Sequence, residues 1–211
     1  VPLLKAMEIV RHVLDNALLV RKVSLRQLRV AADRRRGKED GPAIAALVGP
    51  PLVDAGLSEV AARFEAGIAG HDNIKITRSQ TGDFTRTKGK EVMESFLKAE
   101  GGTEICALYA HNDDMAVGAI QAIKEAGLKP GTDIKVVSID AVPDIFQAMV
   151  AGEANATVEL TPNMAAPAFD ALDAYWKNKT EPAKFIQTES KLYTQADDPQ
   201  AVYDSKKDLG Y

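Results

Sequence analysis

The stretch of sequence that decides the fold is residues 105–123, which read ICALYAHNDDMAVGAIQAI. Residues 105–109 are short and apolar throughout, as is typical of a strand buried on both faces of a sheet. From Asp114 onward, apolar residues recur at three- and four-residue spacing, which predicts an amphipathic helix. The polar residues between the two parts can cap that helix. A buried strand followed directly by a helix is one repeat of an α/β fold.

The same alternation continues on both sides of this stretch. Further apolar runs predict strands over residues 43–48, 74–78, 135–139 and 156–160. Helical spacing predicts helices over residues 59–69, 88–99, 114–126 and 143–151. This alternation predicts an α/β fold with a parallel, doubly wound sheet in the order 2-1-3-4-5 and helices on both faces. A further helix is expected over residues 164–177, then a strand over 185–193 and a polar tail.

Composition places the chain among ordinary globular proteins. It has 211 residues, of which 45% are hydrophobic and 27% charged, and a formal net charge of -4. No apolar run approaches the roughly 18 residues of a membrane helix, and residues 1–20 lack the pattern of a signal peptide. The single cysteine, Cys106, cannot form an internal disulfide and is expected in the core.

Residues 1–40 differ from the remainder of the chain. They hold ten Lys and Arg against five Asp and Glu, whereas the remainder holds sixteen against twenty-five. The segment is left unassigned, and a solvated helix or a disordered arm is the simplest interpretation.

Sequence signatures of enzymes are absent. The chain contains no glycine-rich dinucleotide or phosphate loop, no G-x-S-x-G and no H-E-x-x-H. Its three histidines lie far apart, and its one cysteine has no evident base. We therefore expect no catalytic residue, no cofactor and no metal site.

Binding residues are expected where the strands end, because open parallel sheets bind ligands outside the carboxyl ends of their strands. The candidates are Asn112, Asp140 and Phe84. An amide both donates and accepts, a carboxylate accepts from two hydroxyls, and an aromatic ring stacks on the apolar face of a sugar. Three structural alternatives stay open: Asn112 as a helix cap, Asp140 as a loop cap before Pro143, and Phe84 as a core residue.

Three neighbouring residues have less specific interpretations. His111 is expected behind the binding residues or at the surface. Asp113 and Asp114 resemble a metal-binding pair, but acids that open a helix explain them more simply, because the helix dipole favours them there.

Four runs together resemble a known family. They are SQTGDF at residues 79–84, YAHNDDMA at 109–116, SID at 138–140 and ATVELTP at 156–162. They resemble the periplasmic sugar-binding proteins of bacterial ABC importers, of the ribose type and closest to the galactofuranose-binding members. The resemblance covers about two thirds of the chain, from residue 73 onward.

The resemblance implies a two-lobed fold that closes on a monosaccharide and then docks on an inner-membrane permease, in the periplasm. Asn112 and Asp140 match the polar ligands of the second lobe, and Phe84 matches an aromatic residue that packs on the sugar. Residues 41–160 correspond to the carboxyl-terminal lobe, 161–185 to a hinge crossing and a helix of the first lobe, and 186–211 to a returning strand and tail. The chain is expected to be truncated or frameshifted at its amino end.

Two other function classes are alternatives to sugar import. Repressors of the lac type carry the same sugar-binding fold behind a DNA-binding head, and residues 23–28 resemble the opening of such a head faintly, although no recognition helix follows. An enzyme on a flavodoxin-like fold is the third class. Import requires no contact with nucleic acid.

Overall fold

One sheet forms the frame of the protein. The computed structural model describes residues 43–48, 75–99, 105–183, 186 and 188–209, and within them the strand order is β2-β1-β3-β4-β5-β6. The strands are β1 (Ala43–Val48), β2 (Lys75–Thr81), β3 (Ile105–Ala110), β4 (Lys135–Asp140), β5 (Ala156–Glu159) and β6 (Leu192–Thr194). The first five pair in parallel, and β6 pairs antiparallel with β5. The predicted parallel order 2-1-3-4-5 is confirmed, with one antiparallel strand added at its edge.

The added strand is shorter than the predicted strand over residues 185–193. Its three residues pair with Ala156, Thr157 and Val158. Because β5 has only four residues, its neighbour can form ladder hydrogen bonds only along that length. The hydrophobic pattern of one strand does not reveal the length of its partner, and this prediction was wrong for that reason.

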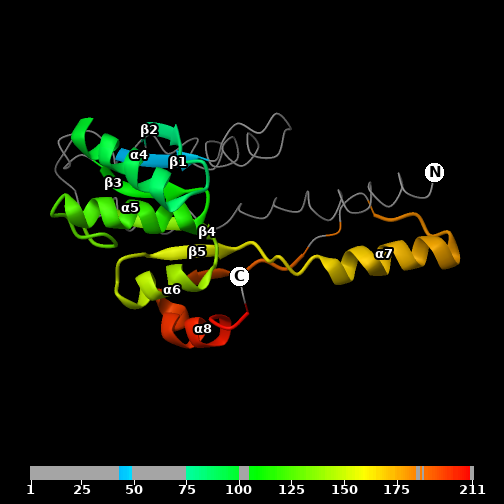
Figure 1. Cartoon of the computed structure of the whole chain (residues 1–211). Coiled ribbons are helices and arrows are strands. Elements are labelled where there is room, and N and C mark those ends of the chain that lie inside the picture. The colour runs from blue at the N-terminus through cyan, green and yellow to red at the C-terminus, as the bar shows by residue number, and fades with distance from the viewer. Residues whose placement is uncertain (1–42, 49–74, 100–104, 184–185, 187, 210–211) are drawn as a thin grey trace.

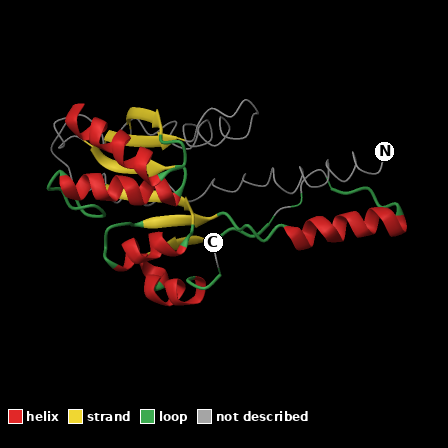
Figure 2. Ribbon diagram, viewed as in Figure 1, coloured by secondary structure: helices red, strands yellow, loops and turns green. Residues whose placement is uncertain are grey.

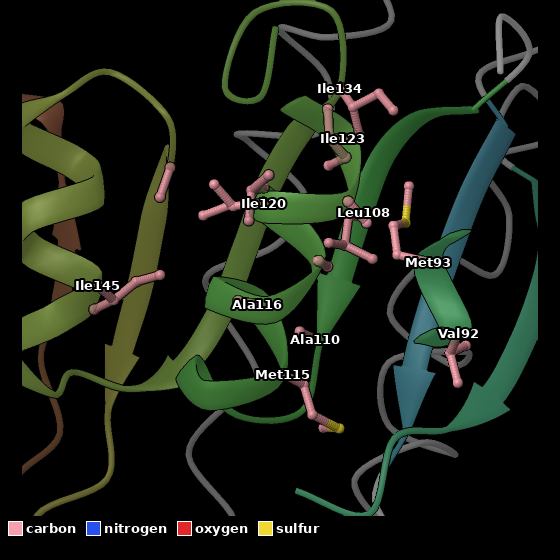
Figure 3. Close-up of a cluster of buried hydrophobic side chains, with 14 of the residues drawn as sticks. Val92, Met93, Leu108, Ala110, Met115, Ala116, Ile120, Ile123, Ile134 and Ile145 are labelled. Carbon is pink, nitrogen blue, oxygen red and sulfur yellow. The ribbon is translucent and has the colours of Figure 1, made fainter. Parts of the chain in front are cut away.

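Three helices cover one face of the sheet, as Figures 1 and 2 show. They are α4 (Arg86–Ala99), α5 (Asp113–Glu125) and α6 (Pro143–Val150). Each connects strands by a crossover in the same direction along the sheet, so right-handedness puts all three on one side. The main hydrophobic core lies between them and the strands, and Figure 3 shows side chains from α4, α5 and β3 meeting there.

The opposite face of the sheet carries a second apolar cluster. Cys106, Tyr109, Val137 and Ile139 belong to it, and all four are buried. The buried position predicted for Cys106 is therefore confirmed. The helix predicted over residues 59–69 lies outside the described residues, as do residues 1–40 and the repressor-like segment 23–28.

Close contact between α4 and α5 fixes the position of both helices. A Cβ added at Gly118 of α5 would lie 2.0 Å from the backbone oxygen of Arg86, and one at Gly89 of α4 would lie 2.5 Å from that of Met115. Both helices therefore need glycine where they cross. Gly127 has a φ of 78° and ends α5 as predicted, with the N–H of Leu128 bonded to the carbonyl of Ile123 at 3.1 Å.

Beyond β5 the chain forms α7 (Ala165–Asn178), which extends away from the sheet in Figure 1. The helix predicted over residues 164–177 is thus confirmed to within a residue. Its Phe169 and Trp176 are 67% and 51% exposed. None of the described helices combines the length and the apolar character needed to cross a bilayer.

The polar tail contains a helix that the sequence analysis missed. α8 (Pro199–Lys206) packs on α6, and the side chain of Gln147 donates to the Tyr203 hydroxyl at 2.7 Å. Asp198 caps it by accepting from the N–H of Ala201 at 3.3 Å. Aspartate followed by proline is a helix-start signal that was present in the sequence.

The crossing of α4 and α5 gives a testable prediction for Gly118→Ala. Alanine has the better helix propensity by about 1 kcal/mol, but its Cβ would collide with a backbone carbonyl that cannot move aside. We expect the free energy of unfolding to fall by about 1–3 kcal/mol, measured by urea unfolding.

Gly152→Ala is the matched control. Gly152 has a φ of 74° with nothing within 4 Å of an added Cβ, so this change tests backbone strain without a collision. Gly152→Ala should lower the free energy of unfolding by less than Gly118→Ala does. A Gly118→Ala variant as stable as the unaltered chain would contradict the close crossing.

Candidate functional site

The candidate site lies at the carboxyl edge of the sheet, where β3 and β4 end side by side. Tyr109 and Val137 are register partners in these two strands. Asn112 and Asp140 each follow that pair by three residues, so the chain carries both to the same edge. Neighbouring strands lie about 4.8 Å apart, which makes this edge a place where both side chains can face one small molecule.

Asn112 is the N-cap of α5. Its Oδ1 accepts from the backbone N–H of Met115 at 2.9 Å, and its Nδ2 donates to the carbonyl of Phe84 at 3.2 Å. The capping role left open in the sequence analysis is therefore real. These two bonds use one of the two amide N–H groups and one of the two lone pairs of Oδ1, so a capping Asn112 retains hydrogen-bonding capacity for a ligand.

Phe84 reaches the same edge through the loop after β2. Its φ is 56° and that of Asp83 is 50°, and Thr85 closes the turn with a bond to the carbonyl of Gly82 at 3.1 Å. The ring is partly buried and packs against the main core. The backbone carbonyl of Phe84 thus accepts a hydrogen bond from the side chain of Asn112. The ring of Phe84 packs on the core, which is the structural alternative that the sequence left open.

Asp140 ends β4 in an unusual backbone conformation. Its φ is 123°, and that of the following Ala141 is 64°. Burial, together with the negative charge of Asp114, raises the pKa of Asp140 to about 7, although a hydrogen bond from the backbone of Asp113 opposes the shift. The group therefore lies close to its titration midpoint at neutral pH, and its ionised form gains from any added hydrogen-bond donor.

Asp113 is the residue whose role the sequence analysis missed. The sequence predicts an acid that opens a helix, and Asp113 does lie in the first turn of α5, but it is also fully buried. It accepts hydrogen bonds from the Ser138 hydroxyl, from Thr157 Oγ1 at 2.9 Å and from the Val142 backbone N–H at 2.9 Å. Burial raises its pKa to about 7, although these three bonds oppose the shift. The available signal was one hydroxyl residue among the apolar residues of each of the two strands, Ser138 in β4 and Thr157 in β5.

Asp114, in contrast, is only partly buried and forms an ion pair. Arg86 contacts Asp114 through Nε at 2.6 Å and Asp144 through its guanidinium at 2.6 Å. The three residues lie at the starts of α4, α5 and α6 and tie those starts together. The metal-pair alternative for Asp113 and Asp114 finds no support, since their carboxylates are engaged separately and the described residues contain no group of metal-ligating side chains.

His111 is buried, with 6% of its surface exposed, so of the two expected positions the surface is wrong and the one behind the binding residues remains. Its ring packs edge-on against Tyr109, with the centroids 5.3 Å apart. Burial lowers the pKa of His111 to about 4. It is therefore neutral at physiological pH, and it lies behind the binding residues at the carboxyl edge of the sheet.

The chain is similar in sequence to known sugar-binding proteins. Residues 26–180 match the model of the family described as periplasmic binding protein domain. The chain is 63% identical over 149 residues to the galactofuranose-binding protein YtfQ of Escherichia coli K12, a match covering 70% of this chain and 46% of that protein. It is 34% identical over 123 residues to the ribose import binding protein RbsB of Salmonella typhimurium LT2, covering 58% and 40%.

Structural similarity agrees with these matches. A solved structure described as that of a galactofuranose binding protein superposes with a TM-score of 0.77 at 50% identity, covering 95% of this chain and 64% of that one. The chain spans about half the length of the curated relatives it matches. With the family model covering most of the sequence, the chain belongs to the periplasmic binding protein domain family.

Proposed function

We propose that this chain captures a monosaccharide, galactofuranose or a close relative, as the substrate-binding component of an ABC sugar importer. The observation that carries the proposal is the placement of Asn112 and Asp140 at the ends of adjacent strands, each three residues after the register pair Tyr109 and Val137, in a chain 63% identical to a galactofuranose-binding protein. The sugar would lie against the carboxyl edge of the sheet. The protein would bind its ligand without transforming it.

The chemistry of the two polar residues suits sugar hydroxyls. The ionised carboxylate of Asp140 can accept from two hydroxyls in charge-assisted hydrogen bonds. Asn112 can donate its second N–H to a ring or hydroxyl oxygen while it continues to cap α5. Phe84 would add apolar contact through the exposed part of its ring. Each residue has a distinct role, so the proposal can be tested one residue at a time.

The remaining partners follow from the same proposal. The sugar-loaded protein would deliver its ligand to an inner-membrane permease, and it would do so in the periplasm. Residues 41–160 would act as the sugar-binding lobe, and 161–185 would form the crossing toward a first lobe. The returning segment, 186–211, contains β6 and α8, which pack against this lobe.

Nuclear magnetic resonance titration tests the proposal, because it detects weak as well as tight binding. Methyl galactofuranosides would be compared with the corresponding galactopyranosides, which have the same composition but a different ring. We expect the furanosides to shift the backbone amide signals of Asn112 and Asp140. Absence of shifts at millimolar furanoside, or shifts confined to other parts of the chain, would contradict it.

Asp140→Asn should weaken furanoside binding about 10- to 100-fold at pH 8. The change removes a charge-assisted hydrogen bond, which contributes about 1.5–3 kcal/mol. The dissociation constant from the titration is the measurement. Asp144→Asn is the matched control, since Asp144 is an exposed carboxylate paired with Arg86 at the same edge. It should change the dissociation constant less than about twofold.

Furanoside binding should weaken as the pH falls from 8 to 6. The pKa of Asp140 in the folded chain is raised to about 7, so the ionised fraction drops from about nine-tenths to about one-tenth over this range. If only the ionised form accepts both hydroxyls, the dissociation constant rises about tenfold.

Asp113 also has a pKa raised to about 7, and Asp114, paired with Arg86, is the other charge near Asp140. Asp140→Asn separates these contributions, because it should remove the pH dependence together with most of the affinity. A full pH dependence retained in Asp140→Asn would assign it to Asp113 and count against the role of Asp140.

A further inference from the structure

The turn between β4 and α6 is strained at two consecutive residues. Asp140 has a φ of 123° and Ala141 a φ of 64°, and neither is glycine. Residues with a Cβ rarely adopt such conformations, and they persist only where the surroundings over-determine them. Strain of this kind is concentrated at functional sites, so the groups that impose it here are of interest.

Two buried side chains hold this turn by its backbone. Thr157 Oγ1 accepts from the N–H of Ala141 at 3.2 Å, and Asp113 Oδ2 accepts from the N–H of Val142 at 2.9 Å. The Thr157 hydroxyl in turn donates to Asp113 Oδ1 at 2.9 Å. Asp113 and Thr157 are fully buried. Two successive N–H groups of the turn therefore depend on one connected pair of side chains.

We propose that Asp113 and Thr157 are positioning residues for sugar recognition: they hold the Asp140–Val142 turn in its strained conformation and so fix the direction in which the Asp140 carboxylate leaves β4. The role in recognition rests on the proposed sugar-binding function. The hold on the turn does not, because it is a property of the chain without ligand.

The cost of this arrangement supports a functional role. Burial raises the pKa of Asp113 to about 7, which shows that the fold disfavours the charged form at this position. An apolar residue would fill the same space without that cost. Ser138 does not share the hold on the turn, since its hydroxyl donates to Asp113 and not to the backbone of the turn.

The test compares Thr157→Val with Ser138→Ala. Valine keeps the shape of threonine but removes the acceptor for the Ala141 N–H, whereas Ser138→Ala removes a partner of Asp113 without touching the turn. The first readout, without sugar, is amide hydrogen exchange at Ala141 and Val142. The second is the dissociation constant for methyl galactofuranoside.

We expect Thr157→Val to speed exchange at Ala141 about tenfold or more and to raise the dissociation constant about tenfold, with exchange in the core of α5 unchanged. Ser138→Ala should change neither quantity more than about twofold. Adding Ala141→Gly to Thr157→Val should restore much of the affinity, because glycine adopts the left-handed conformation without strain. A purely structural role for Thr157 would not be rescued in this way.

Unchanged exchange at Ala141 in Thr157→Val would overturn the hold on the turn. Faster exchange with unchanged affinity would overturn the role in recognition. If the unaltered chain binds no furanoside, the proposed function fails, and the exchange results alone decide whether these residues hold the turn. If Thr157→Val does not fold, the unaltered chain decides: Ala141 and Val142 exchanging as fast as exposed turn residues would refute the proposal.

Discussion

One buried carboxylate organises the carboxyl edge of this sheet. Asp113 follows β3, opens α5, and accepts hydrogen bonds from β4, from β5 and from the turn into α6. A buried polar group costs free energy unless its hydrogen bonds are made, and each donor would be equally costly if left alone. The strands and helices that meet here are therefore fixed relative to one another, since moving one would leave buried donors or acceptors unsatisfied. Asp140 belongs to the turn that this group holds.

The neighbouring part of the edge is fixed by close packing instead. Gly118 lets α4 approach α5 until backbone meets backbone, and Asn112 then bonds to the carbonyl of Phe84 across the two loops. Arg86 completes the arrangement by linking Asp114 and Asp144. The candidate binding residues therefore lie on elements that cannot shift independently of one another. Such preorganised side chains suit the recognition of a small, rigid molecule.

The sequence was sufficient to predict the frame but not the polar network. Five strands, their order and the course of α5 followed from apolar runs and helical spacing, because those patterns reflect burial on a known face. Asp113 was correctly expected to open a helix, but its burial was not predicted, since an acid in a first helical turn normally faces solvent. Nothing local shows that Ser138 and Thr157 will face it from other strands. The short β6 depended on the length of β5, another nonlocal property. Only α8 could have been found, from Asp198 and Pro199.

The short strand β5 is where these constraints converge. Thr157 reaches Asp113 on one side, and two residues later Glu159 accepts from Tyr193 at 3.1 Å and from the nearly buried Lys206 of α8 at 2.6 Å. A four-residue strand has few ladder bonds of its own, so these side-chain bonds hold it in place from both ends. The chain then leaves β5 toward α7 from a fixed point (Figure 1). The position of that exit is therefore held by α8 and β6, although both lie after α7 in the sequence.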